Sequence, residues 1–180
     1  MPGINDVIVY DKNSAYATQK MNEAELFCFL DFNVVSRTGL MHNDLCHYNK
    51  TPKILIDHHL NPTIDVFDLV FSDNTVSSSA ELVYWILMLA YGKTVVTKSV
   101  AECLYTGICT DTGSFSYSCN SPTVYNATAH LVEAGVNVSD IHSNIYNSYS
   151  KERLLLLGFC INQRLRIFDD MKLAYFYISK

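Results

Sequence analysis

The sequence predicts an α/β fold in which one parallel sheet carries helices on both of its faces. Short apolar runs rich in Val, Ile and Phe alternate along the chain with longer segments of helical period. Strands that alternate with helices are typically parallel neighbours joined by helical crossovers. The 180 residues, of which 49% are hydrophobic, are enough to bury one core and the start of a second. We therefore expect one main domain.

Local patterns predict four strands and seven helices. The strands are expected at residues 6–10, 26–32, 53–56 and 66–71. The helices are expected at residues 14–20, 40–48, 78–91, 97–110, 122–133, 138–147 and 151–163. The helix at 78–91 has a serine cap, Glu81 in its first turn and a closing Gly92.

The pattern changes at Leu165, which predicts a second domain. The run "LRIFDDMKLAYFYISK" is typical of two strands around a short Asp-Asp-Met turn. We expect the first domain to occupy residues 1–150. Residues 151–180 then hold a linker helix and the start of a second α/β domain that the chain does not complete.

Composition and charge limit the location and the partners of the protein. The N-terminus has neither the basic nor the apolar region of a signal peptide, and the longest apolar run, from Leu82, is too short to span a bilayer. A cytoplasmic protein without a membrane partner is expected. The net charge of -5 argues against binding of long duplex nucleic acid, so a nucleic-acid substrate would be short. The six cysteines form no CxxC pair and are expected to be reduced.

Carboxylates and imidazoles follow several of the apolar runs. The stretch "ILIDHHLNP" ends in Asp57, His58 and His59, while Asp31 follows "FCFL" and Asp111 follows "YTGICT". The carboxyl ends of parallel strands meet at one edge of a sheet, where ligands bind. Oxygen and nitrogen ligands together suit manganese, magnesium, iron or zinc. We therefore expect these side chains to converge on a metal site.

Each of these residues also has a structural alternative. An Asp after a strand is most often a turn residue or a helix cap, and a His pair is more often hydrogen-bonded structure. Their conjunction favours a functional site. Gly113 allows close approach of the backbone to a ligand, and Ser77, Ser78 and Ser79 at a helix start are placed to donate to a phosphate.

These motifs together resemble the DHH phosphoesterase superfamily. Asp31, "DHH" at 57–59 and "DTG" at 111–113 occur in the family's order and at similar spacings, and the similarity runs from residue 5 to residue 160. The stretches "DFNVVSRTG" and "TVSSSAELVY" most resemble the bifunctional oligoribonuclease and phosphoadenosine phosphate phosphatase group. The resemblance implies a two-metal phosphoesterase acting on short oligonucleotides or small nucleotides.

The resemblance also implies the cofactor and its ligands. Two Mn²⁺ ions, with Mg²⁺ as an alternative, would occupy the complete site. Asp31 would bridge the two ions, while His58 and Asp111 would ligate one of them. Such a pair of ions lowers the pKa of a shared water and holds the attacking and leaving oxygens at phosphorus.

Further residues are implied to act on the substrate. His59 would face the substrate phosphate as a hydrogen-bond donor or acid, and Asp57 would orient the histidines. Arg37, Ser78 and Ser79 are candidate substrate contacts. For Arg37, a solvated arginine at a helix start is an equal alternative.

The sequence departs from the family at its first motif. No histidine precedes His42 and no Asp-x-Asp pair precedes Asp31, although the family has both there. We therefore expect the chain to be an internal fragment or truncated product that is inactive alone. Two other functions stay open: a manganese-dependent inorganic pyrophosphatase, and a non-catalytic remnant that binds a nucleotide or metal. A homodimer also stays open.

Overall fold

The computed structural model of the protein describes residues 1–45, 47–48 and 50–178. It divides into two compact units, Met1–Asn137 and Val138–Lys180. The division lies before helix α6 (Val138–Tyr146), whereas the sequence placed a boundary near residue 150. The assignment of functional domains to these units stays a prediction.

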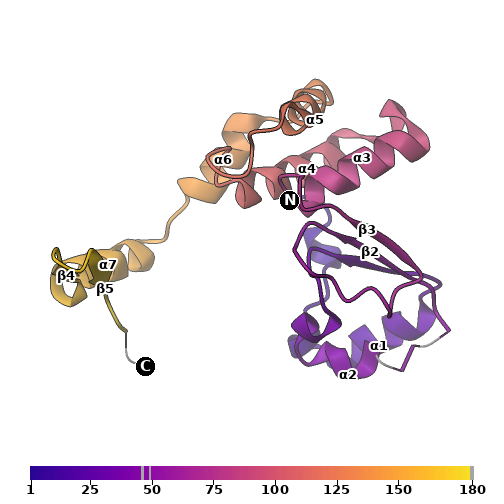
Figure 1. Cartoon of the computed structure of the whole chain (residues 1–180), viewed down its shortest axis with the longest axis horizontal. Coiled ribbons are helices and arrows are strands. Elements are labelled where there is room, and N and C mark those ends of the chain that lie inside the picture. The colour runs from indigo at the N-terminus through magenta and orange to yellow at the C-terminus, as the bar shows by residue number, and fades with distance from the viewer. Residues whose placement is uncertain (46, 49, 179–180) are drawn as a thin grey trace. The chain divides into compact units, whose positions relative to one another are not determined.

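Three parallel strands form the sheet of the first unit, in the order β1-β2-β3 (Figure 1). They are β1 (Phe27–Leu30), β2 (Lys53–Asp57) and β3 (Leu69–Ser72). The register pairs Leu30 with Ile56, and Asp57 with Ser72. Three of the four predicted strands are thereby confirmed, and their carboxyl ends form one edge.

Helices flank this sheet, as the α/β prediction requires (Figure 1). Helices α1 (Ser14–Glu23) and α2 (Met41–Leu45) pack on one face, where their apolar side chains join those of β1 and β2 in a core. The buried members of this core are Met21, Phe29, Leu45 and Leu55. Helix α3 (Ser79–Tyr91) also contacts β2.

Helices α3 and α4 form a hairpin that returns to the edge of the sheet. Helix α4 (Lys98–Asp111) follows α3 after the short turn η4 (Lys93–Val95), and the two helices pack together. A Cβ atom added at Gly107, near the end of α4, would lie 2.6 Å from Cβ of Ala80, near the start of α3. The N-terminus of α3 and the C-terminus of α4 therefore lie side by side. Helix α5 (Pro122–Glu133) packs against both.

The prediction of a strand at residues 6–10 is wrong. In its place are two short 3-10 turns, η1 (Ile4–Asp6) and η2 (Tyr10–Lys12), and in the described part of the chain no strand pairs with this segment. The apolar side chains of Val7, Ile8 and Val9 are exposed, and only Tyr10 of this segment packs against the core among the described residues. The helix predicted at 40–48 is also shorter, since α2 ends at Leu45; Cys46 lies outside the described residues.

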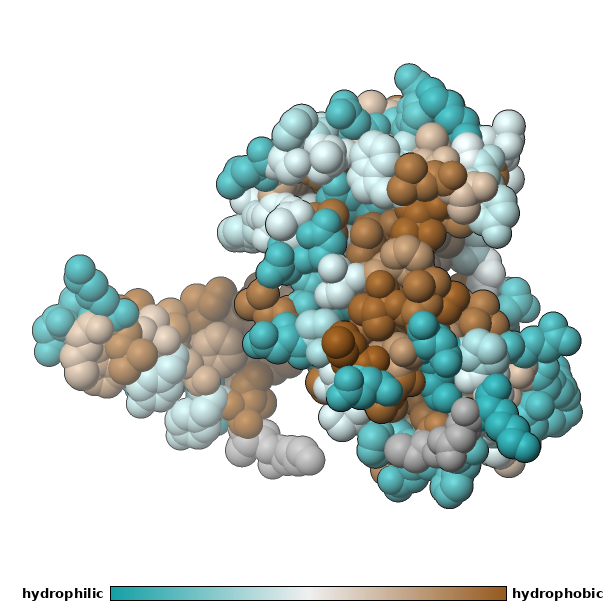
Figure 2. Space-filling view, turned by 45° about the vertical axis from the view of Figure 1, so that its right-hand side comes forward, coloured by the Kyte–Doolittle hydropathy of each residue, from teal (hydrophilic) through white to brown (hydrophobic). Residues whose placement is uncertain are grey.

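The second unit holds two helices and a hairpin. After α6, helix α7 (Lys151–Phe159) continues into a π turn at Cys160–Arg164. The antiparallel strands β4 (Arg166–Phe168) and β5 (Leu173–Tyr175) then confirm the predicted hairpin around "DDM". Many of the apolar side chains of this unit are exposed, and Figure 2 shows hydrophobic surface on it as on the first unit.

Two predictions from composition can be compared with the structure. Within the described residues, no helix is both long enough and apolar enough to cross a membrane. The cysteines were expected to be reduced, and those at positions 28, 103, 119 and 160 are free. Cys46 lies outside the described residues.

Candidate active site

Asp31 stands one residue beyond β1 and faces the end of β2. Its backbone N–H donates to the carbonyl of Ile56 over 3.2 Å, which extends the ladder by one residue. Its φ of 67° then places it in the left-handed region, which few residues other than glycine adopt. The strand therefore ends here, and the carboxylate projects from the carboxyl edge of the sheet with its side chain 58% exposed.

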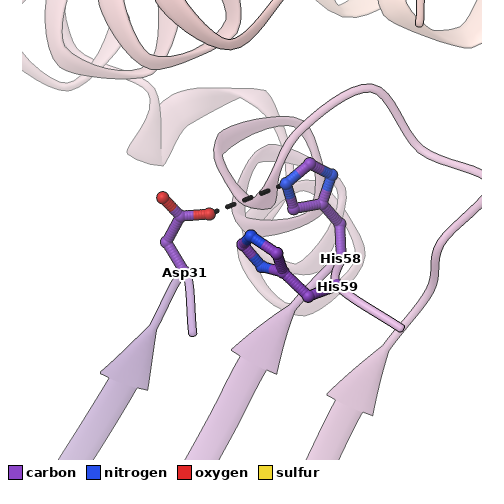
Figure 3. Close-up of side chains that lie close together, drawn as sticks. All are labelled: Asp31, His58 and His59. Carbon is purple, nitrogen blue, oxygen red and sulfur yellow. Dashed lines mark ion pairs between the residues drawn. The ribbon is translucent and has the colours of Figure 1, made fainter. Parts of the chain in front are cut away.

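His58 lies between two carboxylates that come from distant parts of the chain. Its Nε2 atom is 3.7 Å from Oδ1 of Asp31 and 3.1 Å from Oδ2 of Asp111. Figure 3 shows Asp31 and His58 turned toward each other from the ends of adjacent strands. The predicted convergence of Asp31, His58 and Asp111 is thus present in the fold, while their role as ligands stays a prediction.

His59 is fixed by the buried carboxylate of Asp57. The His59 ring atom Nδ1 is 2.7 Å from Oδ1 of Asp57, and the His59 backbone N–H donates to Oδ2 over 3.1 Å. Since a carboxylate only accepts, Nδ1 carries the proton and Nε2 is the nitrogen left for other partners. Asp57 is fully buried. The described bonds of its side chain go to His59, although the sequence analysis expected it to orient both histidines.

Asp111 reaches the cluster by a route different from the expected one. It is the last residue of α4 and not the end of a strand, because the apolar run before it has helical period. The return of α4 along α3 brings it to the sheet edge. Burial raises the pKa of the Asp111 carboxyl; the nearby His58 opposes this rise and Asp31 adds to it. A cation bound here would relieve the repulsion between these carboxylates.

The start of α3 supports the cluster from the side. Ser79 Oγ donates to Oδ1 of Asp31 over 2.9 Å. Ser78 is 1% exposed, and its hydroxyl caps α3 by accepting the backbone N–H of Glu81. Glu81 in turn accepts the backbone N–H of Ser77, the residue before the cap. Both predicted substrate contacts on α3 thus have protein partners, and their substrate roles stay predictions.

Arg37 takes no part in these bonds. It is exposed on the short turn η3 (Val35–Thr38), and in the described part of the chain its guanidinium has no partner. Its predicted contact with substrate therefore stays a prediction.

The donor set fits a divalent cation. Asp31, His58 and His59 each offer one ligand atom, and these atoms lie within 4.8 Å of one another. One carboxylate oxygen and two imidazole nitrogens are suitable ligands for manganese, iron or zinc. The predicted ligand set contained Asp111 in place of His59. In the structure Asp111 lies against His58, so both carboxylates and both imidazoles are within reach of this edge.

A cavity of about 730 Å³ opens beside the two histidines. Apart from His58, His59, Leu60 and Val76, its walls carry amides and hydroxyls, from Asn33, Asn74, Thr75, Ser118, Asn120 and Ser121. Sequence reasoning missed these six residues. The rule that strand ends carry function would have pointed to Asn33 and Asn74, which follow β1 and β3. No comparable signal marks residues 118–121, which join α4 to α5.

The part of the chain that contains Asp31, His58 and His59 matches a known protein family. The profile described as DHH family, N-terminal domain, matches residues 4–108, more than half of the sequence. This chain belongs to the DHH family. The matched range includes Asp31 and the Asp57–His59 group, so the residues that meet at the sheet edge lie mainly within the family domain.

The solved and curated relatives of this DHH protein align with different fractions of its sequence. The crystal structure of an exopolyphosphatase-related protein from Bacteroides fragilis is similar, with a TM-score of 0.90 and 34% identity over 97% of this chain and 50% of that one. Uncharacterised proteins of Mycoplasma pneumoniae and Mycoplasma genitalium are 38% and 35% identical over 95 residues. Those matches cover 52% of this chain and 28% of each relative.

Proposed function

We propose that this DHH protein hydrolyses phosphate esters of short oligonucleotides or small nucleotides, with two Mn²⁺ ions, or Mg²⁺ in their place, in the complete site. The observation that carries the proposal is the convergence of Asp31, His58, His59 and Asp111 at one sheet edge. Family membership supports phosphoester chemistry, and the related Bacteroides fragilis structure is itself described as exopolyphosphatase-related.

The side chains divide between holding metal and handling protons. Asp31 and His58, with Asp111 beside them, would hold the divalent ions. Ions bound there would supply positive charge to the phosphate oxygens and lower the pKa of a water molecule. His59 is suited to a different task, because its Nδ1 is tied to Asp57 and its Nε2 is left for other partners.

Hydrolysis removes a proton from the attacking water and delivers a proton to the leaving oxygen. The water oxygen bonds to phosphorus as it gives up its proton, the ester P–O bond breaks, and the leaving oxygen is protonated. In this proposal, Nε2 of His59 donates a hydrogen bond or a proton to the phosphate group. Asp57 fixes the ring orientation and stabilises the protonated imidazole.

The proposed activity belongs to the whole protein. The chain covers 50% of the related solved chain and 28% of the curated relatives. The cluster of Asp31, His58, His59 and Asp111 offers enough ligand atoms for one metal ion of the proposed pair. We propose that the remaining ligands are those of the family's first motif, a histidine and an Asp-x-Asp pair, absent before Asp31.

Product formation with Mn²⁺ tests the proposal, as mononucleotide from a dinucleotide and as inorganic phosphate from the other substrates. An adenylyl dinucleotide, phosphoadenosine phosphate and inorganic pyrophosphate are compared as substrates, in the 180-residue chain and in a protein carrying the flanking segments of its gene. We expect turnover of the first two substrates in the longer protein and little in the shorter one. Preference for pyrophosphate, or no turnover of any substrate, would contradict the proposed function. Equal turnover by both proteins would show that the first motif is dispensable.

A further inference from the structure

The cavity beside the two histidines has an uncharged, hydrogen-bonding wall. Among the described residues, its lining contains no Lys, Arg, Asp or Glu. A chain of phosphates entering it would lose hydration at every charged group and gain no cation in exchange. Beside the cavity, Asp31 and Asp111 add negative charge near His58. The cavity is therefore poorly suited to successive phosphate units.

Part of the wall is held rigid by bonds within the protein. Asn33 Nδ2 donates to the carbonyl of Leu60 over 2.8 Å, and the Thr75 hydroxyl donates to Asp73 over 2.6 Å. Ser121 caps α5 by accepting the backbone N–H of Thr123. These three bonds fix the shape of the cavity before a ligand arrives.

The remaining polar groups are available to a ligand. Within the described residues, the side chains of Asn74, Ser118 and Asn120 make no hydrogen bond, and all three are exposed. An amide offers two donors and one acceptor oxygen, and a hydroxyl offers both functions. A nucleobase and a ribose present the same mixture of donors and acceptors without charge. The volume of about 730 Å³ lies within the range of about 300–1,000 Å³ that is usual for small-molecule sites.

We propose that this cavity binds the nucleoside part of the substrate and selects nucleotides over chains of inorganic phosphate. The inference rests on the proposed phosphoesterase function and assigns the part of the substrate that does not react. The reacting phosphate lies at His58 and His59, and the adjoining nucleoside extends along the amides. Leu60 and Val76 offer apolar surface to the face of the base.

The first test measures binding alone and does not depend on turnover. The 180-residue chain is titrated with adenosine, and in a second series with inorganic tripolyphosphate, while NMR follows the side-chain amide signals of Asn74 and Asn120. We expect adenosine to shift both signals and tripolyphosphate to leave them in place. Shifts with tripolyphosphate but not with adenosine would overturn the inference.

The second test measures selectivity in the protein with its flanking segments. The double variant Asn74→Ala/Asn120→Ala loses two hydrogen-bonding groups, so kcat/KM for an adenylyl dinucleotide should fall by roughly 10- to 100-fold. Its affinity for Mn²⁺ should not change. Asn43→Ala, an exposed change on α2 outside the cavity, is the matched control. The variant Asn120→Lys should raise kcat/KM for tripolyphosphate, because it adds the missing cation.

The two proposals fail in different ways. Absence of turnover of every phosphoester would contradict the phosphoesterase function, while the adenosine titration would still decide the role of the cavity. Dinucleotide turnover that is unchanged in the double variant would overturn the nucleoside site and leave the phosphoesterase function standing. A preference of the unmodified protein for tripolyphosphate would contradict both proposals.

Discussion

His58 and His59 are adjacent in sequence but are held by different partners. The two rings lie 4.8 Å apart and meet edge to face at 70°. His58 faces two carboxylates that are positioned to share a cation, whereas His59 turns its Nδ1 to Asp57. Replacing one or the other should therefore give different defects.

The first prediction separates these two roles. His58→Ala removes the nitrogen that we propose as a metal ligand, and it should weaken Mn²⁺ binding measured by calorimetry. His59→Ala should reduce turnover by about 10²- to 10⁴-fold, the usual cost of losing a positioned acid, with a smaller change in metal affinity. Equal losses of stability with unaltered Mn²⁺ titration in both variants would instead indicate two structural histidines.

The second prediction concerns Ser79 as the residue that positions Asp31. Ser79→Ala removes the hydroxyl that donates to the exposed Asp31 carboxylate, a charge-assisted bond typically worth about 1.5–3 kcal/mol. The carboxylate gains freedom, and calorimetric titration should show Mn²⁺ affinity falling by roughly tenfold. Ser36→Ala, at an exposed position on η3, is the control. An unchanged affinity in Ser79→Ala would mean that the bond does not position Asp31.

The sequence predicted the parts of the site that follow strands. The rule that parallel strands present ligands at their carboxyl ends is sufficient for Asp31 and for His58, since both follow short apolar runs. It does not account for Asp111, which follows the helix predicted at residues 97–110 and reaches that edge because α4 packs against α3. The bond between Ser79 and Asp31 joins residues 48 positions apart, and no local pattern encodes it.

At the scale of elements, the hairpin of α3 and α4 depends on two small residues at its contact. Gly107→Ala would normally stabilise a helix interior by up to about 1 kcal/mol. Here the new methyl group would lie 2.6 Å from Cβ of Ala80, and overpacking typically costs about 1–3 kcal/mol. We therefore expect a lower free energy of unfolding, measured by chemical denaturation.

A second glycine provides the matched control for this change. A Cβ atom at Gly158 in α7 would meet nothing within 4 Å, so Gly158→Ala should show only the gain in helix propensity. A rise in stability for Gly107→Ala similar to that of the control would show that α3 and α4 separate without cost.

A further prediction at this scale concerns acid stability of the elements that cover the sheet. The hydroxyls of Tyr10 and Thr18 donate to Asp44 on α2 over 2.7 and 2.9 Å, and these bonds lower the pKa of the Asp44 carboxyl. Because the folded pKa lies below the unfolded value, the stabilisation is present above about pH 4 and is lost as pH falls through the folded pKa. Asp44→Asn should therefore destabilise at neutral pH, and the difference from the unmodified protein should shrink toward about pH 3.

Denaturation midpoints at several pH values provide the measurement. Asp6→Asn, an exposed change near the same end of the chain, is the control. A deficit in Asp44→Asn that is the same at both ends of the pH range would contradict the prediction. The same bonds show why the strand predicted at residues 6–10 does not form. Tyr10 is bonded to helix α2, and among the described residues no strand lies beside this segment to pair with it.

At the scale of the whole molecule, the charge of -5 predicts which nucleic acids are excluded. Long duplex DNA is bound chiefly through its phosphates, and this chain offers no broad basic field to neutralise them. Fluorescence anisotropy at physiological salt should detect no binding of a labelled duplex, with or without Mn²⁺. Tight, strongly salt-dependent binding would contradict both this prediction and the preference for short substrates.

The architecture also ties site assembly to folding. Asp31, His58 and Asp111 come from the ends of two strands and one helix, and they meet only when the sheet and the α3–α4 hairpin are formed. A ligand that binds only the folded state shifts the folding equilibrium toward it, by about 2.7 kcal/mol at a hundredfold excess over its Kd. Metal supply would therefore govern how long the protein persists, as well as whether it reacts. Without the proposed ion, the chain would spend more time unfolded and be more readily degraded.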